Sequence, residues 1–156
     1  MITRRRALVA AGAGVLLGGC GAPDEPPPDA TLLRESAGAE RDLADAYQRL
    51  GGELGDALSA RARRNAERLQ GLLGGKDGAP TRLSAQPVGG DPERRALDAT
   101  RRAMRVHVRA VGLLRTSAHR VAVADVLTDD AQHDAVLSAR FGGDALASAF
   151  PDGREA

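Results

Sequence analysis

Five polar residues interrupt the apolar faces of four segments with helical spacing. They are Glu40, Asn65, His107, Asp130 and His133. Asp130 and His133 are three residues apart, so both side chains lie on one face of a helix. Carboxylates and imidazoles are ligands for Zn, Fe and Mn, and two of each could hold a single ion. The candidate metal ligands are therefore Glu40, His107, Asp130 and His133.

The same residues also allow a metal-free interpretation, and this is the one that we favour. Burying an unpaired carboxylate is costly, so each carboxylate needs a partner. The two carboxylates can pair with the two histidines, and with Asn65 or Arg68, without an ion. This interpretation predicts that Glu40 or Asp130 lies within hydrogen-bond reach of a histidine or of Asn65. The metal interpretation predicts that at least three of the four candidate ligands point at one spot.

Apolar residues recur every three or four positions in four segments, which predicts four amphipathic helices and no strands. The segments run from Asp29, the expected N-cap, to Leu50; from Glu53 to Leu73; from Asp91-Pro92 to a break at Thr116-Ser117; and from there to Phe141. Their inward residues include Tyr47, Leu72 and Met104. Counted from that break, Met104 lies level with Asp130, and His107 lies about one turn, ~5 Å, nearer the break.

The connections between the segments predict how the helices are arranged. Tight turns join the first segment to the second and the third to the fourth, so each pair is expected to be antiparallel. Residues 74–91 are rich in Gly and Pro and are numerous enough to cross the length of the bundle. The expected fold is all-α, a four-helix bundle of two antiparallel hairpins joined by a long crossover. An up-down-up-down bundle is the alternative topology.

The four segments resemble a ferritin-like domain of the kind found in secreted and lipid-anchored proteins of high-GC bacteria. The most similar stretch is VLTDDAQHDAVL, residues 126–137, with its acidic residue and Gln-His pair. The resemblance implies a di-iron site with Glu on helices one and three and Glu-x-x-His on helices two and four. Glu40 fits this pattern, but Asn65 and Arg68 replace the ligands of helix two, helix three has no inward carboxylate, and Asp130 replaces Glu. The resemblance therefore implies a degenerate site with one ion or none.

The first nineteen residues have the features of a signal peptide. Three arginines, at positions 4–6, precede an apolar stretch, residues 7–19, that is too short to span a membrane. Leu17-Gly18-Gly19-Cys20 resembles the lipobox of bacterial lipoproteins, which implies that Cys20 is diacylglycerated. Residues 3–8 resemble a twin-arginine export signal, with the general secretory route as the alternative. We expect a lipid-anchored protein on the outer face of the cell membrane.

These observations divide the chain into four parts. We expect a signal peptide (1–19), a lipidated cysteine with a proline-rich tether (20–29), the ferritin-like bundle (30–143) and a C-terminal tail (144–156) in which Leu146 and Phe150 dock. Removing residues 1–19 leaves 22 − 3 = 19 basic and 21 acidic residues, a net charge of −2. This near-neutral balance offers no electrostatic basis for binding nucleic acid. Cys20 is the only cysteine, so no disulfide can form within the chain.

Two functions are compatible with the sequence. The first is a non-catalytic envelope module that binds a protein partner, a small ligand or a second copy of the chain, and carries a degenerate di-metal site. The second is a metal-binding protein (Fe, Mn or Zn) with residual redox or metal-handling activity. The sequence contains no Gly-x-Ser-x-Gly, no phosphate-binding loop and no Cys-x-x-Cys. We therefore favour a protein that is not an enzyme.

Overall fold

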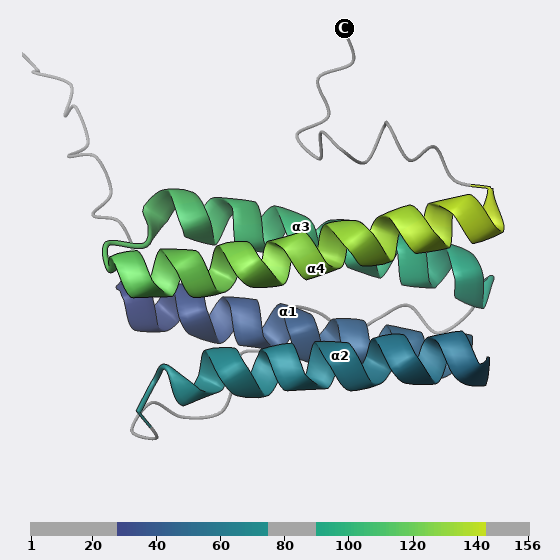
Figure 1. Cartoon of the computed structure of the whole chain (residues 1–156), viewed down its shortest axis with the longest axis horizontal. Helices are drawn as coiled ribbons and strands as arrows, with labels where there is room; N and C mark the ends of the chain where they lie inside the picture. The colour runs from purple at the N-terminus through teal and green to yellow at the C-terminus, as the bar shows by residue number, and fades with distance from the viewer. Residues whose placement is uncertain (1–27, 75–89, 143–156) are drawn as a thin grey trace, which may run out of the picture.

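The computed structural model describes residues 28–74 and 90–142, which form a bundle of four helices (Figure 1). These are α1 (Asp29–Leu50), α2 (Gly52–Gly71), α3 (Pro92–Leu113) and α4 (Ser117–Phe141). The described residues contain no strand, which confirms the all-α prediction. None of these helices combines the length and the apolar character that crossing a membrane requires. The expectations for the signal peptide, Cys20, the crossover and the C-terminal tail concern residues outside the described ranges.

The helix ends follow the local signals in the sequence, with one exception. Gly51 and Gly142 have φ values of 71° and 80°, which favour glycine and end α1 and α4. The Asp91 side chain accepts a hydrogen bond from the Glu93 backbone N–H (3.0 Å), as expected of an N-cap. The prediction that Asp29 caps α1 is wrong, because Asp29 is already inside that helix and its N-cap is Pro28.

The Asp29 carboxylate instead caps the neighbouring helix, α4. It accepts hydrogen bonds from the backbone N–H groups of Arg115 (2.8 Å) and Thr116 (2.9 Å). Thr116 is the N-cap of α4 and its own side chain makes no capping bond, so the start of this helix needs an external acceptor. These hydrogen bonds lower the pKa of Asp29, the bonds to Thr116 and Arg115 most of all.

Two apolar clusters show the relative directions of the helices. The first cluster joins the beginning of α1, the end of α2, the end of α3 and the beginning of α4, and includes Leu32, Leu33, Leu69, Leu114, Val123 and Val126. The second cluster joins the opposite ends of the same helices and includes Leu43, Tyr47, Leu58, Leu97 and Leu137. Helix α1 is therefore antiparallel to α2 and α3 and parallel to α4.

These directions have a consequence for the connection between the two hairpins. The end of α2 and the beginning of α3 lie at opposite ends of the bundle (Figure 1), so residues 75–89 link positions separated by its length. In the up-down-up-down alternative α3 would run parallel to α1, and it does not. The neighbours of α1 are α2 and α3, so the α2–α4 face and the α1–α3 face lie on opposite sides of the bundle.

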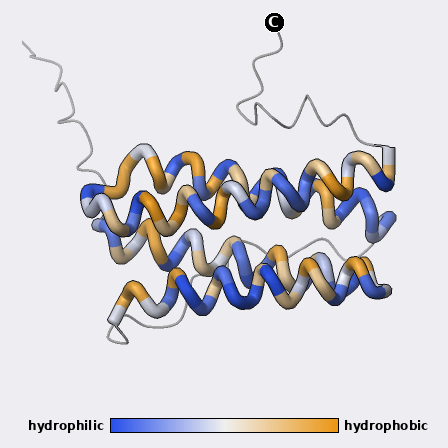
Figure 2. The backbone as a smooth tube through the Cα atoms, in the orientation of Figure 1, coloured by the Kyte–Doolittle hydropathy of each residue, from blue (hydrophilic) through white to orange (hydrophobic). Residues whose placement is uncertain are grey.

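The core is built mainly from leucine, valine and alanine. Tyr47 and Met104 are buried, as predicted. Apolar and hydrophilic residues are interspersed along the helices (Figure 2), and each helix contributes buried apolar residues to the core. Leu72, predicted to face inward, is 38% exposed because α2 ends at Gly71 and the chain then turns.

A buried acid–histidine cluster as candidate metal centre

A polar layer crosses the middle of the bundle between the two apolar clusters. It consists of the five residues identified from the sequence: Glu40, Asn65, His107, Asp130 and His133. In α1, for example, Glu40 lies between Ala37 of the first apolar cluster and Leu43 of the second. Every helix contributes at least one side chain to this layer, and all five residues are buried.

Three of these side chains converge, one each from α1, α3 and α4. Glu40, His107 and Asp130, which we call the acid–histidine cluster, are fully buried. Glu40 Oε1 lies 2.9 Å from His107 Nε2, and the same nitrogen lies 3.4 Å from Asp130 Oδ2. One potential ligand atom from each residue lies within 4.8 Å of the other two. The predicted hydrogen bond between a carboxylate and a histidine is thus present, and so is the convergence of three candidate ligands.

His107 reaches Asp130, although the sequence places it one turn nearer the break between the helices. Met104 was expected to lie level with Asp130. Side chains on a helix lean toward its N-terminus. In the antiparallel pair α3–α4, His107 therefore leans away from the connecting turn and Asp130 leans toward it, which closes the offset of one turn.

His133, the fourth candidate ligand, lies beside the cluster rather than in it. Its Nδ1 is 4.0 Å from Asp130 Oδ1, too far for a hydrogen bond. Its ring meets the Tyr47 ring edge-on, with centroids 5.6 Å apart. Tyr47 in turn donates a hydrogen bond to Thr100 Oγ1 (2.8 Å), whose hydroxyl donates to the Ala96 carbonyl. His133 is 9% exposed and therefore lies between the cluster and solvent.

Burial controls the protonation of the cluster. It raises the pKa of Glu40 to about 8, an effect that the nearby Asn65 amide partly opposes. Burial, together with the neighbouring Glu40 carboxylate, raises the pKa of Asp130 well above its usual range. Burial also lowers the pKa values of His107 and His133. At neutral pH and without a cation, Glu40 therefore keeps its proton and His107 is neutral, and Glu40 Oε1 and His107 Nε2 share a hydrogen bond.

Several polar atoms of the layer lack a hydrogen bond of normal geometry. They are Glu40 Oε2, both carboxylate oxygens of Asp130, His107 Nδ1, His133 Nδ1 and Asn65 Nδ2. Buried polar atoms are normally satisfied, so such a concentration at one level indicates a place where a further ligand fits. In the described residues no arginine or lysine forms an ion pair with Glu40 or Asp130.

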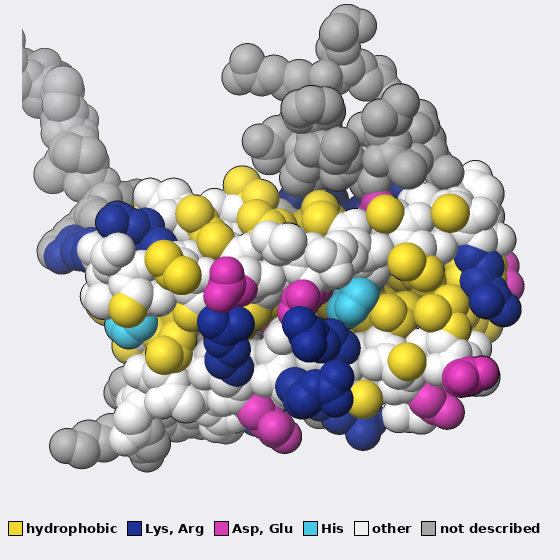
Figure 3. Space-filling view, viewed as in Figure 1, with side chains coloured by type: hydrophobic (Ala, Val, Ile, Leu, Met, Phe, Trp, Pro, Cys, Tyr) yellow, Lys and Arg dark blue, Asp and Glu magenta, His cyan; other side chains and the backbone are white. Residues whose placement is uncertain are grey.

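The two sides of the bundle around the cluster differ in chemistry. On the α2–α4 face, histidine, acidic and basic side chains lie together at mid-length (Figure 3). Arg61 of α2 makes a two-pronged ion pair with Asp129 of α4, with both N–O distances 2.9 Å, and Arg68 pairs with Asp125 at 2.7 Å. The choice of these partners depends on how α2 and α4 pack together.

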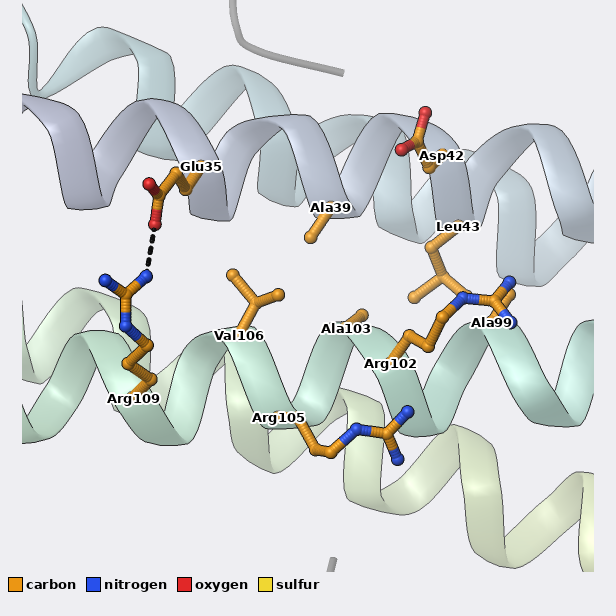
Figure 4. A pocket seen from close by; sticks show the side chains of 10 residues that line it. All are labelled: Glu35, Ala39, Asp42, Leu43, Ala99, Arg102, Ala103, Arg105, Val106 and Arg109. Atoms are coloured by element: carbon orange, nitrogen blue, oxygen red, sulfur yellow. Dashed lines mark hydrogen bonds and ion pairs between the residues drawn. The ribbon is translucent and has the colours of Figure 1, made fainter. Parts of the chain in front are cut away.

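The opposite side carries a groove between α1 and α3, of about 510 Å³ (Figure 4). Its floor is apolar and includes Ala39, Ala103 and Val106. Its α3 rim is basic: Arg102, Arg105 and Arg109 line it, and Arg109 pairs with Glu35 of α1 at 2.8 Å. The floor of this groove separates solvent from the polar layer with apolar side chains.

One buried ion pair next to the cluster was not anticipated from the sequence. Asp134, in the turn of α4 after His133, is 2% exposed and pairs with Arg101 at 3.1 Å. Asp134 is next to His133 in the sequence, and the spacing of apolar residues in this segment does not indicate whether its carboxylate is buried or exposed.

The donor set of the cluster suits one transition-metal ion. Donor atoms bound to the same ion at about 2.0–2.2 Å lie roughly 3.0–3.5 Å apart, and two of the three separations here are near that range. Because all three side chains are fully buried, the cluster can hold an ion but does not open to a larger substrate. Comparison of the chain with protein-family models, curated proteins and solved structures found no match.

Proposed function

We propose that this protein is a lipid-anchored, extracytoplasmic helical bundle that binds one divalent transition-metal ion through Glu40, His107 and Asp130. The observation that carries the proposal is the convergence of two carboxylates and one imidazole, from three helices, within 4.8 Å in a fully buried layer. The lipid anchor at Cys20 and the location on the outer face of the cell membrane rest on the lipobox resemblance.

The charge of the cluster supports a cation. With both carboxylates ionised and His107 neutral, the cluster carries −2 in an apolar environment, and a divalent cation cancels this charge. Without a cation, protons must do so, in agreement with the raised pKa values of Glu40 and Asp130. A bound ion would also satisfy buried oxygens that lack a hydrogen bond. It would cross-link α1, α3 and α4, and its role would be ion holding rather than catalysis.

We also propose that the bundle is ferritin-like and that its site is a reduced form of a di-iron centre. Two antiparallel hairpins, with α1 antiparallel to α3 and a long connection between the hairpins, support this idea. Asn65 and Arg68 occupy the positions where that resemblance implies Glu and His. Arg68 reaches out to Asp125, away from the cluster, so α2 supplies no charged ligand and a single ion is the expected stoichiometry.

A second candidate function is a metal-free module that binds a protein partner. It is supported by the 2.9 Å contact between Glu40 and His107, which already satisfies one atom of each side chain. In that case the polar layer only determines how the helices pack, and function resides on the surface.

Metal analysis of the purified full chain separates these functions. After equilibrium dialysis against Zn²⁺, Mn²⁺ or Fe²⁺, the unchanged chain should retain one ion, and Asp130→Asn should retain none while its helical circular dichroism persists. Exposed Asp98→Asn is the matched control and should keep the ion. A chain that retains no ion under any of these conditions would favour the metal-free module. Full retention by Asp130→Asn would show that the ion binds elsewhere.

A further inference from the structure

We infer that the ion reaches the acid–histidine cluster through the α2–α4 face, with Asp129 as the outer carboxylate that first receives it and His133 as the next group inward. This inference rests on the proposed function. It concerns residues outside the three ligands, and it assigns a role to one particular ion pair among those that join α2 to α4.

A line of polar groups leads from solvent to the cluster on this face. The Asp129 side chain is 18% exposed, that of His133 is 11% exposed, and that of Asp130 is fully buried. His133 Nδ1 lacks a hydrogen bond and faces Asp130 Oδ1 across 4.0 Å. Asp129 and His133 are four residues apart in α4, so their side chains are neighbours on one face of that helix. The three groups therefore form successive steps from solvent to a buried ligand.

The α1–α3 groove cannot serve a cation in the same way. Its floor of Ala39, Ala103 and Val106 offers no ligand atom from a side chain. Two carboxylates, Glu35 and Asp42, also line the groove, but Glu35 pairs with Arg109 and Asp42 is not free. Arg102 and Arg105 on the rim have no ion-pair partner among the described residues, and their guanidinium groups repel a cation (Figure 4). The larger hollow is thus the less suitable path.

Arg61 determines how available Asp129 is. Its guanidinium occupies both oxygens of Asp129, while its own side chain is 49% exposed. The Arg61 side chain is half exposed, so its guanidinium can move away from Asp129 into solvent. The Asp129 carboxylate is then available to a cation at the edge of the polar layer. Removing the Arg61 guanidinium should therefore speed cation uptake, and removing the Asp129 carboxylate should slow it. If the pair were only a steric barrier, both changes would speed uptake.

The rate of uptake can be followed with a reporter that the chain already contains. Tyr47 is the only tyrosine, there is no tryptophan, and its ring contacts His133. Paramagnetic Co²⁺ bound in the cluster should quench its fluorescence. The experiment is stopped-flow mixing of Co²⁺ with the full chain, in a Cys20→Ser background that removes the competing thiol, with equilibrium dialysis to measure final occupancy.

Arg61→Gln should accelerate quenching and Asp129→Asn should slow it, each by about tenfold, which is the lower end of electrostatic effects on association rates. Both variants should still reach one ion per chain, since the three ligands are unchanged. His133→Phe, which keeps the ring edge beside Tyr47, should also slow uptake. Arg68→Gln and Asp125→Asn alter the other α2–α4 ion pair and are the matched controls, and Arg105→Gln tests the groove. These three should leave the rate unchanged.

The outcomes distinguish metal binding at the cluster from access through the α2–α4 face. If the unchanged chain binds no ion at equilibrium, the proposed function fails and the access path fails with it. If it binds one ion but Arg61→Gln and Asp129→Asn bind at the unchanged rate, only the access path is wrong. Acceleration by both variants would indicate a steric barrier and overturn the role of Asp129. Acceleration by Arg105→Gln alone would move the path to the α1–α3 groove.

Discussion

At the scale of single residues, the distinctive feature of this protein is a group of ionisable side chains buried inside an apolar core. An Ala/Leu/Val interior encloses two carboxylates and an imidazole that lie within hydrogen-bond distance or slightly beyond it. Glu40 is the most informative of the three because its carboxyl group is fully buried and its pKa is raised to about 8. Its protonation therefore couples the site to the stability of the whole bundle.

We predict that the metal-free chain loses stability as the pH rises from about 6.5 to 8, a range above the ordinary pKa of His107 and His133, where neither histidine titrates in the folded or unfolded chain. The folded-state pKa of Glu40, about 8, exceeds its ordinary value of 4.5, so its contribution is complete below 4.5 and is lost as the pH approaches 8. The expected slope is about 1.4 kcal/mol per pH unit for one proton. Urea unfolding in the presence of a chelator, at several pH values, measures it.

Glu40→Gln is the variant that tests this assignment, because glutamine has no proton to lose in this range. The pH slope should become shallower in Glu40→Gln, with Asp130 responsible for what remains. Adding Zn²⁺ to the unchanged chain at pH 7.5 should restore the lost stability, since the ion replaces the protons. An equal slope in the two chains would show that Glu40 is not the titrating group.

At the scale of helices, two features matter only where one helix meets another: a cap supplied by a neighbouring helix and a glycine at a close contact. Helix α4 begins without a side-chain cap of its own and takes its acceptor from Asp29 at the start of α1. Helices α1 and α2 approach so closely that a Cβ on Gly55 would lie 2.6 Å from the Tyr47 carbonyl oxygen. Neither contact can be recognised from the sequence of a single helix.

We predict that Asp29→Asn weakens the bundle most at neutral pH. Because hydrogen bonding lowers the pKa of Asp29, its carboxylate stabilises the fold above its ordinary pKa, and this contribution is lost as the pH falls through the folded value. The urea midpoint of Asp29→Asn should therefore fall at pH 7 and approach that of the unchanged chain in acid. The exposed Asp98→Asn should change neither. A midpoint difference that persists in acid would mean that the charge of Asp29 is not the cause.

Two glycine-to-alanine changes in helices should have opposite effects. Gly55→Ala forces a Cβ against the backbone of α1 and should destabilise the fold by about 1–3 kcal/mol. Gly112, near the end of α3, has no atom within 4 Å of an added Cβ, so Gly112→Ala should stabilise the fold by about 0.5–1 kcal/mol. Thermal unfolding followed by circular dichroism measures both. Destabilisation by Gly112→Ala would contradict this account.

At the scale of the whole molecule, the described bundle carries its candidate site in a closed interior. Figure 1 shows α1 beginning at the end of the bundle where α2 ends and α3 turns into α4. A tether that precedes α1 would attach there, and the α2–α4 face would lie along the side of the bundle. Access to the polar layer would then remain open to solvent in the anchored protein.

The anchor itself is tested by changing Cys20. If the lipobox resemblance is correct, the unchanged protein should fractionate with membranes and incorporate a palmitate analogue. Cys20→Ala should lose the label and be released or remain as the uncleaved precursor, because a diacylglyceryl group is what makes retention stable. Ser84→Ala, in the long connection, is a control that should be labelled normally. An unlabelled wild-type protein would mean that the proposed location is wrong.

Sequence periodicity alone was sufficient to predict the four helices and the burial of the polar layer. Helical ends and inward faces depend on neighbours three or four residues away. For this reason the end of α1 at Leu50 and the burial of Glu40, Asn65 and Asp130 agree with the prediction. The prediction for Leu72 was wrong because α2 ends at Gly71, two residues before the predicted end at Leu73.

Tertiary structure alone decided which atoms of the polar layer meet. Three contacts depend on the level, rotation and direction of one helix relative to another. They are the approach of His107 to Asp130, the displacement of His133 from the cluster and the pairing of Arg61 with Asp129. Those quantities result from packing two apolar clusters at opposite ends of the bundle, between residues far apart in the chain. The spacing of residues within one helix contains no information about them.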